Sequence, residues 1–328
     1  MTPGLRPFFP LQLNASPFQM GAIPRKYQPG SLLTIKLSAS HTVTFVSEKV
    51  VTPSISSSQI LVVRPQKIPP GLSPSLSLDS WYILKIYDPR YVFLRERHYC
   101  PRNGTLVREE HPWTLEAELK AAAYRHSLGV RIWEDDPWLD YFNDLELEVF
   151  RELRYYRLAK RAWESEVDAY RVLNKSSLAG VDVPHFYGAG DLDLEKERRG
   201  IVPRASVFEY LEDAVSLDDL QLGGDLDFLK AWHVKAFEDL FKRINKVGIT
   251  HERVLSHNLL IMPKRVVVVD FGGASVRPQG CTNKQWAKRV DTEGDSVAVG
   301  KVVKWIVGKE EFEQLTSPEV EGGDPPSN

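Results

Sequence analysis

Residues 248–274, GITHERVLSHNLLIMPKRVVVVDFGGA, decide the fold. Two apolar runs, NLLIM and RVVVVDF, are separated by only two residues, and this pattern predicts a tight β-hairpin. Polar residues stand at both ends of this hairpin. His251 precedes it, Asn258 is its first residue, and Asp270 lies near its last residue. An imidazole, an amide and a carboxylate, which can bind ligands or take part in catalysis, therefore flank the apolar strands of the hairpin.

The composition indicates a globular chain without a strong global charge. Its 328 residues, 42% of them apolar, are enough to bury a sizeable core. The 42 basic and 44 acidic residues nearly cancel, so we expect no general attraction to nucleic acid or to an anionic membrane surface. Cys100 and Cys281 give neither a disulfide framework nor metal-ligand spacing, which fits a reducing compartment. Because no apolar run spans a membrane and the first residues do not resemble a signal peptide, we expect the cytoplasm or the nucleus.

Strand patterns dominate the first part of the chain. Residues 1–30 and 309–328 are rich in Pro or Gly and predict disordered tails. The runs LLTIKLSAS and HTVTFVSEKVV predict a hairpin, residues 64–80 a flexible loop or insertion, and WYILKIYD a further strand. VPHFYGAGDLD and ASVFEYL predict two more strands farther along the chain.

Helical patterns dominate the later part. Apolar residues recur at spacings of three and four from Leu145 to Tyr170 and predict a long amphipathic helix, preceded by an insertion at 95–150 that contains a shorter helix. DLDFLKAWHVKAFEDLFKRINKVG and DSVAVGKVVKWIVG predict further helices. This order predicts an α+β fold with a sheet-rich lobe at 31–211, a helical lobe at 212–308, and a ligand cleft between them.

Lys85 stands in the strand WYILKIYD, on the same apolar face as Ile83 and Tyr87. An ammonium group on such a face is costly unless an anion pairs with it. On the long helix, Glu166 lies beside the apolar stripe whereas Glu164 points away, so we expect a Lys85–Glu166 ion pair that holds the lysine toward phosphate oxygens. If only these two residues are considered, the alternative interpretation is that Lys85 is solvated and that Glu166 is an ordinary helix glutamate.

The pattern H-x-D-x-x-x-x-N, then two strands, then D-F-G, is met by His251, Asn258 and Asp270 in order, except at its third position. On this compound pattern the sequence resembles the protein-kinase superfamily, and most of all the small degenerate kinase-like proteins of fungal genomes. The resemblance extends from about Leu32 to Gly308 and implies a two-lobe, protein-kinase-like fold.

The resemblance also implies that residues from both lobes bind ATP and Mg²⁺. These are Lys85 and Glu166 at the phosphates, Glu209 and Leu211 in the hinge at the adenine edge, and Asn258 and Asp270 at the metal. Asp295, at the start of DSVAVGKVV, would anchor the backbone of the catalytic loop.

Three departures from the family pattern stand beside these matches. Between the first two strands, LSASHTV contains no glycine, so a Gly-rich loop that cradles phosphate is lacking. The segment after D-F-G is short and lacks A-P-E, so the peptide-binding platform is reduced, and in this the chain looks more like RIO-type atypical kinases or small-molecule phosphotransferases. Arg253 occupies the place of the catalytic aspartate.

An arginine cannot do the work of that aspartate. A guanidinium has only donors and stays protonated, so Arg253 cannot accept a proton from an attacking hydroxyl. Loss of a general base typically removes about two to four orders of magnitude in rate. Glu252 could substitute only if the loop shifted its register, which His251 and Asn258 oppose from either side. The alternative interpretation of Arg253 is a salt bridge with a neighbouring carboxylate, for which Asp270 is a candidate, and a bridge to Asp270 would compete with Mg²⁺.

Three functions remain open on the sequence. The favoured hypothesis is a pseudokinase that retains part of an ATP site and transfers little phosphate. The second is an active ATP-dependent kinase acting on a protein or small-molecule hydroxyl. The third is an interaction scaffold that binds protein partners without nucleotide, which the Gly-free loop favours.

Overall fold

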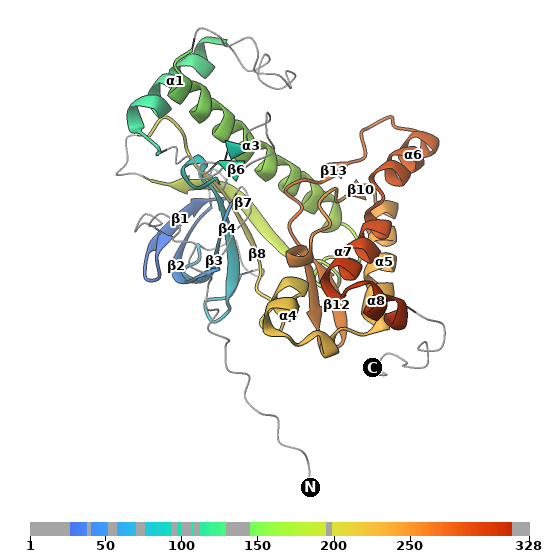
Figure 1. Ribbon diagram of the computed structural model, residues 1–328. Coiled ribbons are helices and arrows are strands. Elements are labelled where there is room, and N and C mark those ends of the chain that lie inside the picture. Colours follow the sequence, from blue (N-terminus) through green and yellow to red (C-terminus); the bar gives the residue numbers. More distant parts are fainter. Residues whose placement is uncertain are drawn as a thin grey trace.

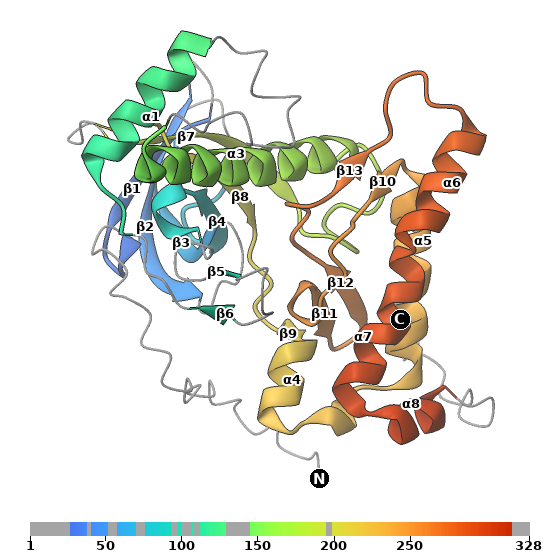
Figure 2. The ribbon, with the colours of Figure 1, turned by 45° about the horizontal axis from the view of Figure 1, so that its top comes forward.

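The computed structural model describes residues 27–37, 41–51, 58–69, 76–92, 98–99, 106–107, 112–128, 145–194 and 199–316. They form a sheet-rich N-terminal lobe and a helical C-terminal lobe, and helix α3 (Leu147–Leu173) runs from one lobe to the other (Figures 1 and 2). This is the α+β, two-lobe arrangement that the sequence predicted.

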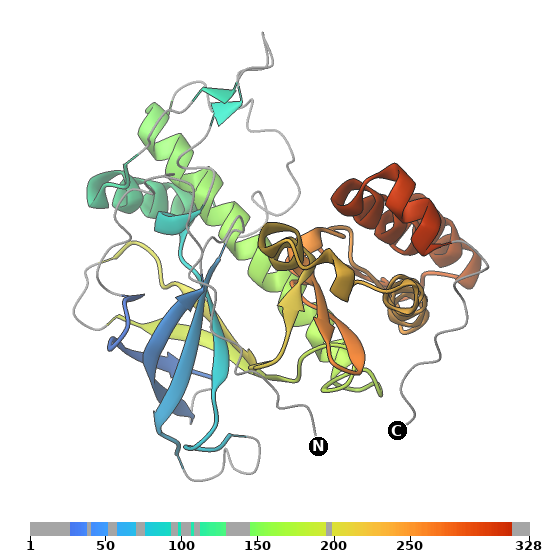
Figure 3. The same cartoon turned by 60° about the horizontal axis from the view of Figure 1, so that its bottom comes forward.

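Six antiparallel strands close the N-terminal lobe into a barrel (Figure 3). In chain order they are β1 (Leu32–Lys36), β2 (Thr42–Val51), β3 (Gln59–Lys67), β4 (Tyr82–Tyr87), β7 (Phe186–Asp193) and β8 (Arg204–Glu209). Around the barrel the order is β1-β2-β3-β4-β8-β7, and β1 closes it by pairing with β7. Gly190 allows this closure, because a β-carbon there would lie 2.0 Å from the Lys36 carbonyl oxygen.

Alternation along the strands separates the barrel core from the face that meets α3. Tyr82, Leu84 and Ile86 of β4 point into the barrel core. The intervening residues lie on the outer face, where Tyr87 packs beneath α3 with Tyr155. Lys85 is thus placed on the face that α3 covers, as a period of two requires.

The C-terminal lobe is built around helix α5 (Ala231–Lys246) and a hairpin of β11 (Leu259–Met262) and β12 (Arg265–Val268). Helix α7 (Asp295–Val307) packs against α5. The remaining elements of this lobe are α4 (Leu217–Gly223), β9 (Val215–Ser216), β10 (Ile249–Thr250), β13 (Ser275–Val276), α6 (Asn283–Glu293), α8 (Lys309–Leu315) and the 3-10 turns Leu226–Phe228 and Ser256–Asn258. In the N-terminal lobe, Pro89–Tyr91 is a further 3-10 turn, and β5 (His98–Tyr99) pairs with β6 (Leu106–Val107).

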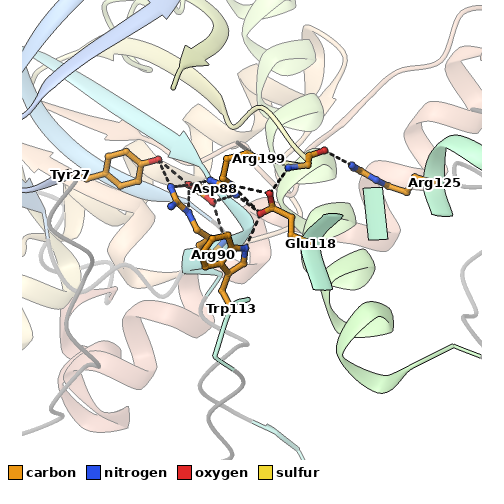
Figure 4. A network of polar contacts seen from close by, with 8 residues as sticks. Tyr27, Asp88, Arg90, Trp113, Glu118, Arg125 and Arg199 are labelled. Atoms are coloured by element: carbon orange, nitrogen blue, oxygen red, sulfur yellow. Dashed lines mark hydrogen bonds and ion pairs between the residues drawn. The ribbon is translucent and has the colours of Figure 1, made fainter. Parts of the chain in front are cut away.

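The insertion before α3 contains helix α1 (Leu115–Leu128), which packs on α3 as predicted. A buried polar network ties α1 to the barrel (Figure 4). Arg199 donates to Glu118 of α1 at 2.6 Å and to Asp88 at 3.2 Å, while Arg90 donates to Asp88 at 2.7 Å. Tyr27 and Trp113 donate to the same two carboxylates. Two guanidinium groups therefore satisfy two buried carboxylates, and α1 belongs to the N-terminal lobe.

Two boundaries predicted from the sequence are wrong. Strand β3 was not predicted, and it extends through residues 64–67, which the sequence analysis assigned to a loop because of their Pro/Ser-rich composition. Pro65 is accommodated next to a register shift of the β2–β3 pair. The predicted tail at 309–328 begins with helix α8, whose Phe312 packs against Gly300 of α7. Residues 1–26 and 317–328, like most of 95–111 and 129–144, lie outside the described residues.

Candidate functional site

Lys85 of β4 forms two ion pairs between the lobes. Its Nζ lies 2.7 Å from Glu166 Oε1 on α3 and 2.6 Å from Asp270 Oδ1, which follows β12. The side chains of Lys85 and Glu166 are 6% and 1% exposed, so this pair is almost completely withdrawn from water. The predicted Lys85–Glu166 ion pair is therefore present, and it is joined by a second carboxylate.

The helix phasing that led to Glu166 is also confirmed. Glu164 pairs with Lys160 one turn earlier on α3, and its side chain is 42% exposed. Positions 164 and 166 therefore lie on different faces of α3, as a period of 3.6 residues requires.

Burial and charge set the ionisation of this cluster. Burial raises the pKa of Glu166 to about 7, against the lowering effect of the Lys85 ammonium. Burial also raises the pKa of Asp270, but Lys85, His251 and Arg253 outweigh it and bring that pKa down to about 2. For Lys85, burial lowers the pKa, and the two carboxylates raise it above its ordinary value. Asp270 is thus the carboxylate that stays ionised most firmly beside the ammonium.

Four aromatic rings form a continuous chain between the lobes beside this cluster. The centroid of Phe186 lies 5.5 Å from that of Tyr170, which lies 5.3 Å from that of Phe271, which lies 4.8 Å from that of His251. Tyr170, Phe271 and His251 are almost fully buried. The rings hold α3 and the two segments around the hairpin in one arrangement, so that Asp270 is kept next to Lys85.

Asp295 fixes the backbone of the loop before the hairpin, as the sequence predicted. Its carboxylate accepts hydrogen bonds from the backbone nitrogens of His251 at 2.7 Å and Glu252 at 3.0 Å. Glu252 and Asp270 have φ values of 62° and 64°, which side chains other than glycine rarely adopt. Strain of this kind persists where the surroundings enforce it, and the buried Asp295 supplies that enforcement at Glu252.

Arg253, which stands where the resemblance in sequence led us to expect a catalytic aspartate, is exposed. Asn258 Nδ2 donates to its backbone carbonyl at 3.0 Å, so the backbone of the loop is held at this point. Within the described part of the chain, the guanidinium makes no ion pair and no hydrogen bond. The expected salt bridge to Asp270 is therefore not formed; Asp270 pairs with Lys85 instead.

The carboxylate of Glu252 is engaged by three donors, Thr250, Arg289 and Ser275. Arg289 Nη2 and Thr250 Oγ1 each donate to Glu252 Oε1 at 2.8 Å. Partial burial raises the pKa of Glu252, but hydrogen bonds from Ser275, Arg289 and Thr250 bring it below its ordinary value. A carboxylate held in this way is a poor candidate to replace a general base.

Asn258 and Asp270 could offer oxygen ligands to a metal. Neither Asn258 Oδ1 nor Asp270 Oδ2 accepts a hydrogen bond from any residue that the structure describes. Mg²⁺ prefers oxygen ligands and commonly takes only one or two from the protein. No group of three or more His, Cys, Asp or Glu side chains that could hold a metal occurs among the described residues. The site thus fits a cation that a phosphate ligand helps to bind.

The predicted hinge follows β8. Glu209 and His185 form two mutual hydrogen bonds. The backbone nitrogen of Glu209 donates to the His185 carbonyl at 2.9 Å, and the backbone nitrogen of His185 donates to the Glu209 carboxylate at 2.9 Å. The side chain of Glu209 is therefore engaged within the lobe. Leu211 accepts a hydrogen bond from Ala214 at 3.3 Å, while its own N–H has no partner in the described ranges. Of the two residues predicted to form the hinge, Leu211 is the one whose backbone N–H has no partner in the described ranges.

The loop that the sequence analysis expected beside the phosphates is not the one next to Lys85. LSASHTV joins β1 to β2, and β1 lies three strands away from β4 in either direction around the barrel. The hairpin next to Lys85 is β2–β3, where Ile60 of β3 is the direct partner of Lys85. Its connection, residues 52–58, has the sequence TPSISSS and also contains no glycine. Most of that connection, 52–57, lies outside the described residues.

Gly273 is a site residue that the sequence analysis missed. A β-carbon at this position would lie 2.6 Å from Cδ and 2.7 Å from Nε of Arg253. The Arg253 side chain therefore lies directly against the glycine that follows Asp270-Phe271-Gly272. In the sequence, this residue could have been found as the second glycine of DFGG, but the pattern considered was only the triplet DFG.

Comparison with known proteins gives distant likenesses of fold. No family profile matches the sequence, and no curated protein matches it. The kinase domain of M. tuberculosis PknI is 14% identical, with a TM-score of 0.38, and the match covers 87% of this chain and 74% of that one. The BubR1 kinase domain is 12% identical, with a TM-score of 0.40, covering 87% of this chain and 66% of that one. No helix within the described residues has the length and apolar character to cross a membrane.

Proposed function

We propose that this chain is a kinase-like protein that binds a nucleotide and transfers little or no phosphate. One contrast carries the proposal. Lys85, Glu166 and Asp270 are assembled within hydrogen-bonding distance, yet a free arginine stands where phosphoryl transfer needs a carboxylate.

The contacts of the binding residues support a nucleotide site. An ammonium has three donors, and Glu166 and Asp270 use two of those of Lys85, which leaves one for a phosphate oxygen. The Leu211 N–H would meet the adenine edge, and Asn258 Oδ1 and Asp270 Oδ2 would hold Mg²⁺. Bound Mg²⁺ would supply positive charge against the phosphates.

The surroundings of Arg253 argue against efficient transfer. A guanidinium cannot take up the proton of an attacking hydroxyl. The neighbouring carboxylate, Glu252, is bound by Arg289 and Thr250 and sits in a strained conformation fixed by Asp295. No unengaged carboxylate is therefore at hand in the loop, residues 251–258.

Thermal unfolding with ATP, with and without Mg²⁺, tests the proposal. Ligand at a hundredfold excess over Kd adds about 2.7 kcal/mol to stability, which a melt detects readily. We expect such a shift in the native chain and its loss in Lys85→Met, with ATP turnover near background. Metal-dependent turnover that Asp270→Ala abolishes would instead establish an active kinase. An unchanged melting temperature at millimolar ATP in both buffers would favour the nucleotide-independent scaffold.

A further inference from the structure

We infer that Arg253 is a phosphate receptor: its guanidinium binds the terminal phosphate of a nucleoside triphosphate and replaces part of the charge that a divalent cation would supply. The inference rests on the proposed nucleotide site and adds a ligand contact and a metal requirement to it. On this inference, Arg253 does more than remove a general base from the site, because it also contributes a contact to the ligand.

The backbone and the side chain of Arg253 are both held in place. Asn258 donates to its carbonyl at 3.0 Å, and Asp295 holds the preceding residue at 3.0 Å. The stem of the side chain lies against Gly273, which leaves no room for a β-carbon. Gly273 follows Asp270 by three residues, and the Arg253 charge lies near enough to Asp270 to lower the pKa of its carboxyl.

The donors of Arg253 are free to bind an anion. The residue is exposed, and none of the described carboxylates pairs with it. Arginines in the same lobe differ in this respect, since Arg289 binds Glu252 and Arg243 binds Asp182. A free guanidinium offers five donors in a planar fork that matches a phosphate group.

The charges of the site agree with this assignment. Two cations, Lys85 and Arg253, balance two carboxylates, Glu166 and Asp270. An aspartate at position 253 would leave three carboxylates against one ammonium, and a polyphosphate could then enter only with added cations. With Arg253 the site carries no net negative charge before any metal binds, so a triphosphate meets less repulsion.

Isothermal titration of the full chain with ATP and with ADP, in EDTA and in Mg²⁺, tests the inference. We expect ATP to bind in EDTA with an affinity within about threefold of that in Mg²⁺. Arg253→Gln should weaken ATP binding in EDTA by about ten- to a hundredfold, the range for a lost hydrogen-bonded charge contact, and should affect ADP much less. Arg253→Lys, which keeps the charge but not the fork, should restore part of the affinity.

Gly273→Ala tests the placement of the arginine without removing its charge. Gly273 does not have a positive φ, and the only close contact of the added β-carbon is a flexible side chain, so the variant should fold. It should lose ATP affinity in EDTA as Arg253→Gln does. Lys288→Gln removes a positive charge from an exposed position on α6 and serves as the matched control, with unchanged affinity.

Three results would overturn the inference. ATP binding that requires Mg²⁺ and is unaffected by Arg253→Gln would refute the phosphate contact and leave the nucleotide site standing. Equal losses for ATP and ADP would refute the assignment to the terminal phosphate. An absence of nucleotide binding in every buffer would refute the proposed function as well.

Discussion

The Lys85 ammonium lies 2.6 Å from Asp270 Oδ1 and so joins a strand of the barrel directly to the C-terminal lobe. The two residues are 185 positions apart in the sequence, and Glu166 meets the same ammonium from α3. One buried nitrogen thus connects three segments that lie far apart in the sequence. The relative position of the lobes and the state of the binding site depend on the same contact.

Removing this nitrogen should destabilise the protein strongly. Lys85→Met leaves Glu166 buried without its cation, and breaking a buried ion pair typically costs about 3–5 kcal/mol. The double change Lys85→Met with Glu166→Leu should recover part of that loss, since Glu166 is then no longer left unpaired and only Asp270 lacks its cation. Urea unfolding measures both. Lys160→Met, which breaks an exposed pair with Glu164, is the control and should cost less than about 1 kcal/mol.

Restoring a carboxylate at the catalytic position should restore chemistry. Arg253→Asp places a proton acceptor on a backbone already held by Asn258 and Asp295, so ATP turnover in Mg²⁺ should rise at least about tenfold, the low side of what a general base contributes. Adding Asp270→Ala should remove the gain. Turnover that stays at background in Arg253→Asp, although ATP binds, would show that other parts of the site are also unfit for transfer.

His233 should make stability depend on pH. Its Nδ1 accepts a hydrogen bond from the Lys230 backbone nitrogen at 2.9 Å at the start of α5, which requires a neutral ring. Burial, with a smaller effect of Lys230, lowers the pKa of His233 to about 4 from its ordinary 6.5. The neutral ring therefore stabilises the fold fully above pH 6.5, and this contribution is lost as the pH falls from 6.5 toward 4.

The measurement compares the free energies of unfolding at pH 7.5 and pH 5 in the native chain and in His233→Gln. A glutamine can accept the same hydrogen bond at either pH. The native chain should lose about 1–2 kcal/mol more than the variant between the two conditions. Equal losses would mean that His233 does not titrate in this range.

Arg199 should hold the insertion helix on the barrel. Arg199→Met leaves Glu118 and Asp88 with fewer donors in a buried network, and a loss of about 3 kcal/mol is expected. Hydrogen exchange in α1 should rise more than exchange in α5. Lys120→Met, which removes the exposed contact between α1 and Glu146, should leave both nearly unchanged. Uniform exchange across the two helices in Arg199→Met would show that α1 is not anchored separately.

The parts of the site that follow from periodicity could be predicted from the sequence. The alternation of β4 and the 3.6-residue period of α3 place Lys85 and Glu166 on facing sides, and the structure has them 2.7 Å apart. The anchor Asp295 followed from its place in a recognised pattern. The Lys85–Glu166 pair needs only the periods of its two elements and the expectation that a buried charge finds a partner, whereas Asp295 needs the resemblance to protein kinases.

The parts that depend on how elements meet could not be predicted in this way. Strand β3 was missed because the Pro/Ser-rich composition from Arg64 onward predicts a loop, and only the pairing with β2 provides the irregular register that accommodates Pro65. Without β3, the loop expected beside the phosphates was assigned to the wrong hairpin. Whether Lys85 or Arg253 pairs with Asp270 also depends on tertiary structure. The distances between these side chains cannot be predicted from the sequence pattern around any one of them.

The pairing of β1 with β7 has a consequence for association with other chains. Each of the six strands has a neighbour on both sides, so this sheet presents no free edge in the described residues. Proteins whose sheets end in an open edge can recruit a foreign strand, whether as a peptide ligand or as the start of an aggregate. Here the seam at Gly190 removes that route. A partner of the N-terminal lobe must recognise side chains on its outer surface and not the backbone of its sheet.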